Sequence, residues 1–140
     1  MLTGGCDGEL GIHEWRSEES KFATIVHRRI HKGAVLEVVA RNEKEFYSVG
    51  EDCSLYGVRR GTADTLTGRL VYRSTLPLRL VSCSLEHESV ACFGDERKIV
   101  IVNDDSTVLW ASDTTKNPLV ALAWSGKRLV IPREPPLVKC

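Results

Sequence analysis

The chain has 140 residues, and its 19 Lys and Arg residues balance 19 Asp and Glu residues. This length predicts one domain with a buried core, and the absence of net charge argues against a nucleic-acid coat or a chain held on membranes by bulk electrostatics. The longest stretch free of charged side chains, Asn117 to Gly126, has ten residues, about half of what a membrane-spanning helix needs. The start of the chain shows no secretory signal, so we expect an intracellular protein, in the cytoplasm or the nucleus.

The five cysteines, at positions 6, 53, 83, 92 and 140, include no C-x-x-C pair. Their odd number and their spacing disfavour a disulfide framework and a zinc site. We therefore expect no metal and no cofactor, and we interpret most of the cysteines as small buried side chains of a reduced protein.

Short β-branched or alternating runs, separated by turn residues, recur along the chain. Examples are Gly68 to Tyr72, Leu78 to Ser84 and Lys98 to Val102. Long stretches with the helical spacing of apolar residues are hard to find. The pattern predicts an all-β domain with many short strands and negligible helix.

A repeated turn is the most informative feature of the sequence. The segments 5–13, 50–58 and 94–102 align, each with Gly, any residue, Asp or Glu, and then two residues before an apolar position. Their first glycines are 45 and 44 residues apart. Each segment predicts a strand, a tight turn opened by Gly and an acidic residue, and a second strand.

This repeat resembles that of the WD-repeat family of β-propellers, in which about 40–45 residues supply one four-stranded blade. The resemblance covers almost the whole chain and implies about three four-stranded antiparallel sheets. It assigns residues 1–30 to the last strands of one blade, residues 31–75 and 76–115 to one blade each, and residues 116–140 to the first strands of a further blade. Because about three repeats cannot close a ring, we expect part of a longer propeller, or copies that associate through open blade edges.

The resemblance is to a divergent member of the family. The family's Trp-Asp pair is missing from every copy, and the aligned dipeptides begin at His13, Val58 and Val102. The most complete copy predicts an innermost strand within residues 31–38, followed by strands at 46–49, 53–58 and 68–74.

Only the second copy keeps the family's His, Ser and Asp together, as His31, Ser48 and Asp52. In WD repeats these side chains hydrogen-bond beneath the blade surface and fix the turn, so the resemblance implies a structural network. The same residue types form hydrolase triads, but the chain has no G-x-S-x-G nucleophile elbow. We therefore expect no catalytic residues and no enzymatic activity.

Two basic segments raise the alternatives of lipid and nucleic-acid binding. Arg59 and Arg60 precede Gly61, and phosphoinositide-binding propellers carry an aromatic residue or leucine before Arg-Arg-Gly, where paired arginines hold lipid phosphates. Here Val58 precedes the pair, which ends a predicted third strand, whereas the family motif comes later in its blade. The segment from Arg28 to Lys32 is interpreted as a solvated basic loop, because no aromatic side chains for base stacking are interleaved with it. We expect no nucleic-acid partner.

The three tryptophans are candidates for core packing or for partner contacts. Trp124 lies in a predicted innermost strand and is expected to be buried. Trp15 and Trp110 lie next to predicted strand ends and are candidate contacts with a protein partner. Since WD-repeat propellers hold proteins together, the resemblance implies a non-catalytic scaffold or adaptor. The alternative is a propeller recruited to phosphoinositides through Arg59 and Arg60.

Overall fold

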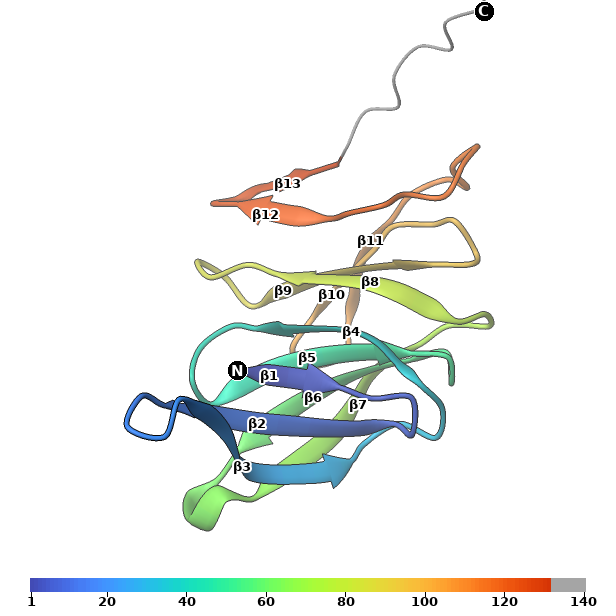
Figure 1. Cartoon of the computed structure of the whole chain (residues 1–140). Coiled ribbons are helices and arrows are strands. Elements are labelled where there is room, and N and C mark those ends of the chain that lie inside the picture. Colours follow the sequence, from blue (N-terminus) through green and yellow to red (C-terminus); the bar gives the residue numbers. More distant parts are fainter. Residues whose placement is uncertain (132–140) are drawn as a thin grey trace, which may run out of the picture.

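The structure is a computed structural model, and it describes residues 1–131. In this part of the chain the strands form four antiparallel sheets that stand side by side (Figure 1). The first sheet contains β1 (Leu2–Gly4), β2 (Glu9–Arg16) and β3 (Lys21–Arg29). The second contains β4 (Val35–Ala40), β5 (Glu45–Gly50), β6 (Ser54–Arg60) and β7 (Leu66–Arg73). The third contains β8 (Leu78–Cys83), β9 (Ser89–Gly94), β10 (Val100–Asn103) and β11 (Val108–Ala111), and the fourth contains β12 (Ala123–Ser125) and β13 (Arg128–Val130).

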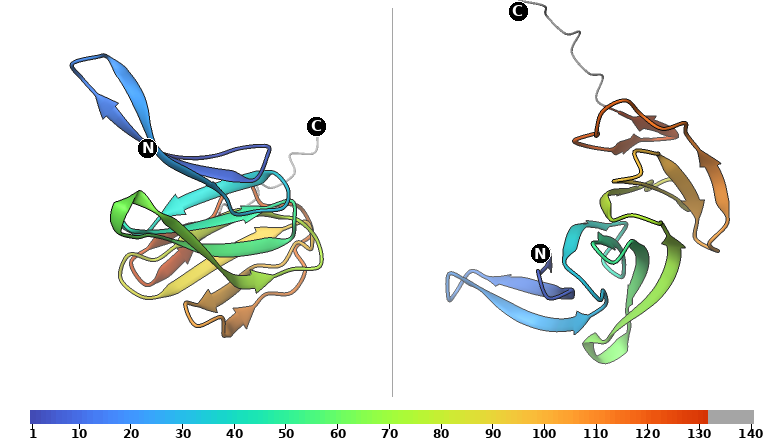
Figure 2. Two further views of the ribbon diagram at one scale, coloured as in Figure 1. Left: turned by 90° about the horizontal axis from the view of Figure 1, so that it is seen from below. Right: turned by 90° about the vertical axis from the view of Figure 1, so that its right-hand side faces the viewer.

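Each sheet follows the order of the chain, so within a sheet every strand pairs with its neighbours in sequence. The first strands of successive sheets touch, β1 with β4, β4 with β8 and β8 with β12. Figure 2 (right) shows the sheets spread along an arc around this inner edge. The predicted all-β fold built from four-stranded antiparallel sheets is confirmed, with two complete sheets, one of three strands and one of two among the described residues.

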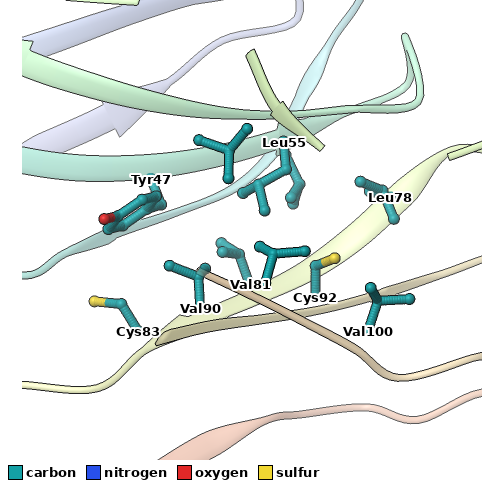
Figure 3. Packing of buried hydrophobic residues seen from close by; sticks show 11 residues of the cluster. Tyr47, Leu55, Leu78, Val81, Cys83, Val90, Cys92 and Val100 are labelled. Carbon is teal, nitrogen blue, oxygen red and sulfur yellow. The ribbon is translucent and has the colours of Figure 1, made fainter. Parts of the chain in front are cut away.

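The core consists of the layers between neighbouring sheets. Successive side chains of a strand point to opposite faces, so Phe46 packs toward the first sheet while its neighbour Tyr47 packs toward the third. In the same way, Cys92 packs toward the second sheet and Phe93 toward the fourth. Strands β5 and β9 are therefore buried on both faces, which explains their nearly continuous apolar sequences. Figure 3 shows the layer between the second and third sheets.

The repeated glycine has a steric cause in the two complete sheets. The amide of Glu51, which follows Gly50, donates a hydrogen bond to the carbonyl of Ala34 over 2.9 Å. The amide that follows Gly94 makes the same 2.9 Å bond to the carbonyl of Pro77. A Cβ atom at either glycine would collide with that carbonyl oxygen. The spacing of 44 residues therefore marks two equivalent close approaches of the backbone.

Within residues 1–131 the one helical element is a short 3-10 turn, Thr62–Asp64, between β6 and β7. No helix in this part of the chain is both long and apolar enough to cross a membrane.

Two predictions about local structure are wrong. Arg28 and Arg29 are not part of a basic loop, because both lie on β3, which runs to Arg29. Half, not most, of the four described cysteines are buried: Cys83 and Cys92 lie in the layer between the second and third sheets, while Cys6 is exposed and Cys53 is partly exposed. Burial raises the pKa of the Cys92 thiol to about 12, so this cysteine acts as an apolar packing residue.

Candidate functional site

The structure brings His31, Ser48 and Asp52 together at one end of the second sheet. The imidazole of His31 is buried, with Nδ1 2.9 Å from the Asp52 carboxylate and Nε2 2.8 Å from the Ser48 hydroxyl. The second carboxylate oxygen of Asp52 accepts a 3.0 Å hydrogen bond from the amide of Lys32. Asp52 thus joins the loop before β4 to the turn between β5 and β6.

The order Asp52, His31, Ser48 is that of a hydrolase triad, but access to the serine is missing. Ser48 lies on β5 and is fully buried, so a substrate carbonyl has no path to its hydroxyl. This burial favours a structural role for the network.

The third sheet contains an equivalent network that the sequence analysis missed. Glu96, two residues after Gly94, accepts hydrogen bonds from the Ser74 hydroxyl over 2.9 Å and from the Thr75 amide over 2.8 Å. Bonds from Thr75 and Ser74 hold the pKa of the Glu96 carboxyl below its ordinary value. The sequence did offer one signal for this network, because Glu96 is the acidic residue of the third aligned turn and corresponds to Asp52. Its partners are Ser74 and Thr75, whereas Asp52 has a histidine as partner.

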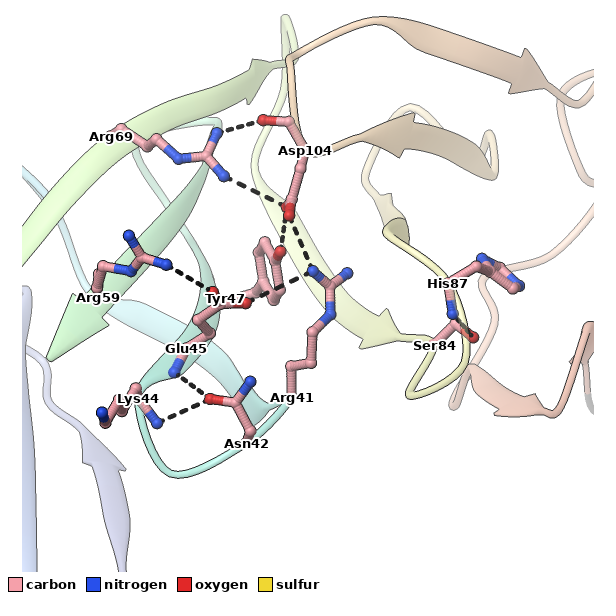
Figure 4. Close-up of polar contacts among 10 residues, drawn as sticks. All are labelled: Arg41, Asn42, Lys44, Glu45, Tyr47, Arg59, Arg69, Ser84, His87 and Asp104. Carbon is pink, nitrogen blue, oxygen red and sulfur yellow. Dashed lines mark hydrogen bonds and ion pairs between the residues drawn. The ribbon is translucent and has the colours of Figure 1, made fainter.

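A second feature that the sequence did not reveal is a polar cluster between the second and third sheets (Figure 4). Asp104, in the turn between β10 and β11, lies 2.9 Å from the Arg41 guanidinium and accepts a hydrogen bond from the Tyr47 hydroxyl. The guanidinium of Arg69 donates to the backbone carbonyl of Asp104. Arg41 also lies over the Tyr47 ring, 5.0 Å from its centroid, a cation–π contact.

Electrostatics make this cluster depend on the charge of Asp104. The Arg41 side chain is only 10% exposed, and its Nε and one terminal nitrogen are buried without a hydrogen-bond partner. Burial opposes ionisation of Asp104, but the Tyr47 hydroxyl and the charges of Arg41 and Arg69 outweigh it and lower the pKa of the carboxyl. Asp104 is therefore the nearest full anion that compensates a buried cation.

Two of the three tryptophans are more than half exposed. Trp15 is 54% exposed and meets Phe22 edge to face, with 5.1 Å between ring centroids. Trp110, on β11, is 51% exposed. The prediction that Trp124 is buried is wrong: it lies on β12 and is partly exposed, although its indole donates a 3.1 Å hydrogen bond to the Ser82 carbonyl.

No protein-family model matches this sequence, and no curated protein does. Solved structures do match the fold of this chain. The WD40 β-propeller domain of Doa1 superposes with a TM-score of 0.63 and 21% identity, over 69% of this chain and 33% of that chain. The fold is that of WD40 β-propeller blades. Sqt1 from Chaetomium thermophilum superposes with a TM-score of 0.73 and 17% identity, over 93% of this chain and 37% of that one.

A second Sqt1 structure, bound to the N-terminus of the ribosomal protein L10, also superposes with a TM-score of 0.73 and 17% identity, over 93% of this chain and 39% of that one. The chain therefore spans between a third and two fifths of the length of these propellers.

In the second blade, the side chains of Arg59 and Arg60 lie apart from each other. Arg59, whose side chain is 74% exposed, lies 3.0 Å from the Glu45 carboxylate, whereas Arg60 donates over 3.0 Å to Asp64. The two residues are adjacent on β6, so their side chains point to opposite faces. Arg59 lines a cavity of about 380 Å³ together with Arg69. Arg60 instead lines a groove of about 780 Å³ between the first and second blades.

Proposed function

We propose that this chain is a non-catalytic protein-binding module, a scaffold or adaptor of the WD-repeat type. One observation carries the proposal: large apolar side chains stay exposed at two ends of a packed blade core. Trp15 and Phe22 lie at one end, and Val108, Leu109 and Trp110 follow one another on β11 near the other. Aromatic side chains of this kind are enriched at the centres of protein interfaces.

Two further observations support the proposal. Sqt1, which shares the blade fold, has been solved bound to the N-terminus of the ribosomal protein L10. The hydroxyl of Ser48 is shut inside the second blade, which removes the strongest candidate nucleophile.

The proposal is tested by affinity capture, with the immobilised chain as bait and an extract of the cells that produce the protein. The parent chain is compared with Trp15→Ala and Trp110→Ala, and Leu85→Ala, an exposed apolar residue in the turn between β8 and β9, is the matched control. We expect a defined set of proteins that either tryptophan variant loses and the control retains. If all four chains retain the same proteins, the exposed tryptophans do not carry the function.

The alternative is recruitment to phosphoinositides through Arg59 and Arg60. Its support is the exposed guanidinium of Arg59 beside Arg69 at the 380 Å³ cavity. It is the weaker candidate, because Glu45 and Asp64 already pair with the two arginines.

Self-association of the chain is a further possibility to test, since β11 presents an exposed apolar edge of the kind that recruits other strands. Light scattering over a range of concentrations measures it.

A further inference from the structure

The groove between the first and second blades has a volume of about 780 Å³. Its apolar lining includes Ile12, Trp15, Ala40 and Phe46. A volume of this size accommodates several side chains of a bound segment. The groove is distinct from the His31 network and from the cluster around Asp104, none of whose residues line it.

A β-bulge borders this groove. Strand β3 pairs with β2 through Val26 opposite Ile12 and through Thr24 opposite His13, which leaves Ile25 without a partner. Bulges bend the strand that carries them, and Figure 2 (left) shows the hairpin of β2 and β3 projecting beyond the other sheets. Trp15 is carried on the projecting part of this hairpin, beyond the bulge.

The opposite wall is the turn between β4 and β5, and it is fixed by its own hydrogen bonds. The side-chain carbonyl of Asn42 accepts from the amides of Lys44 and Glu45, both over 2.8 Å. This Asx-type turn holds Glu43 at the rim of the groove. A rigid wall lowers the entropy that a bound segment costs.

The groove has free negative charge. Glu14 and Glu43 both line it, and the carboxylate of neither forms a hydrogen bond or an ion pair within the described residues. The Arg60 guanidinium, on the same lining, is neutralised by Asp64. The Met1 amino group also lies there and donates a 2.6 Å hydrogen bond to the His13 carbonyl. Two unpaired carboxylates therefore face one cationic amine.

We propose that this groove binds a protein segment in which an arginine stands beside an aliphatic residue. The aliphatic side chain packs against Ala40, which is exposed, and Ile25, which is partly exposed on the same lining. The guanidinium meets the carboxylates of Glu14 and Glu43. Arginine suits this site better than lysine, because a planar guanidinium pairs bidentately with carboxylates.

This inference rests on the proposed protein-binding function and specifies one site for it. Acidic segments and lipid phosphates are disfavoured at the groove, because Glu14 and Glu43 would repel them.

Selection from a displayed library of random short peptides on the immobilised full chain tests the proposal. We expect enriched peptides to contain Arg beside Leu, Ile or Val. A synthetic copy of the most enriched peptide should lose roughly tenfold or more in affinity for Glu14→Gln/Glu43→Gln. Its affinity for the parent chain should fall as salt is added.

The matched control is Glu18→Gln/Glu88→Gln, which removes two exposed carboxylates outside the groove and should bind like the parent chain. Ala40→Lys is a second probe, because Ala40 is exposed on the groove wall and a lysine there should block the peptide without disturbing the core. Selection of acidic peptides, an absence of enrichment, or full binding to Ala40→Lys would overturn the proposal. Enriched peptides that depend on Trp110 instead would reject this groove while leaving the protein-binding function intact.

Discussion

The hydroxyl of Tyr47 donates a hydrogen bond to the carboxylate of Asp104, across the boundary between the second and third blades. The two residues are 57 positions apart in the sequence, and the same carboxylate pairs with the nearly buried Arg41. The contact between these blades is thus an apolar layer together with the polar cluster around Asp104, which is charged and hydrogen-bonded.

Asp104→Ala should therefore destabilise the protein strongly for a turn residue. It leaves Arg41 buried without its nearest anion and Tyr47 without an acceptor, a loss of about 2–3 kcal/mol. Thermal unfolding should shift down by roughly 5–10 °C. Asp105→Ala is the matched control, because Asp105 is exposed and its carboxylate bonds to Thr107 in its own turn. Equal melting temperatures for the two variants would show that the polar cluster around Asp104 adds nothing to the stability of the fold.

Glu96 gives the stability a defined dependence on pH. Bonds from Thr75 and Ser74 lower its pKa in the folded state, so its contribution is complete above the ordinary value of 4.5 and is lost as the pH falls through the folded value. Glu96→Gln should lower the melting temperature near neutral pH, and the difference from the parent chain should shrink below about pH 4.5. A difference that stays constant, or grows, as the solution is acidified would contradict this role.

Asp52→Ala tests the structural interpretation of the His31 network. We expect a loss of about 1–3 kcal/mol, since the imidazole and the Lys32 amide lose their acceptor, and a melting temperature lower by several degrees. Calorimetry on the full chain measures both. A variant that melted like the parent chain but lost a measurable hydrolytic activity would make the network catalytic.

Vesicle flotation separates protein binding from lipid binding. The parent chain and Arg59→Ala/Arg60→Ala are mixed with vesicles that contain phosphoinositides, and vesicles without them are the control. We expect little flotation of either chain, because each arginine already pairs with a carboxylate of its own blade. Strong flotation of the parent chain that the double substitution abolishes would reverse the ranking of the two functions.

The sequence predicted what is local and repeated. The expected strands at 46–49, 53–58 and 68–74 correspond to β5, β6 and β7 within two residues at each end. In both complete blades, a glycine that needs close backbone approach marks the turn after the second strand. The contacts of Asp104 with Arg41 and Tyr47 were not predicted, since they join separate blades and no spacing marks them. The partial exposure of Trp124 was missed for a related reason: its burial depends on what covers β12, which the strand pattern does not specify.

Amide hydrogen exchange on the full chain, alone and with a captured protein partner, tests the central claim most directly. In the free chain we expect slow exchange in β5 and β9, which are buried on both faces, and fast exchange at the tip of the hairpin of β2 and β3 and along the outer edge of β11. The partner should slow exchange at that hairpin or at β11 and leave the centre of the second blade unchanged. Protection that appears instead around Ser48 and His31, with the exposed tryptophan strands unaffected, would contradict the account.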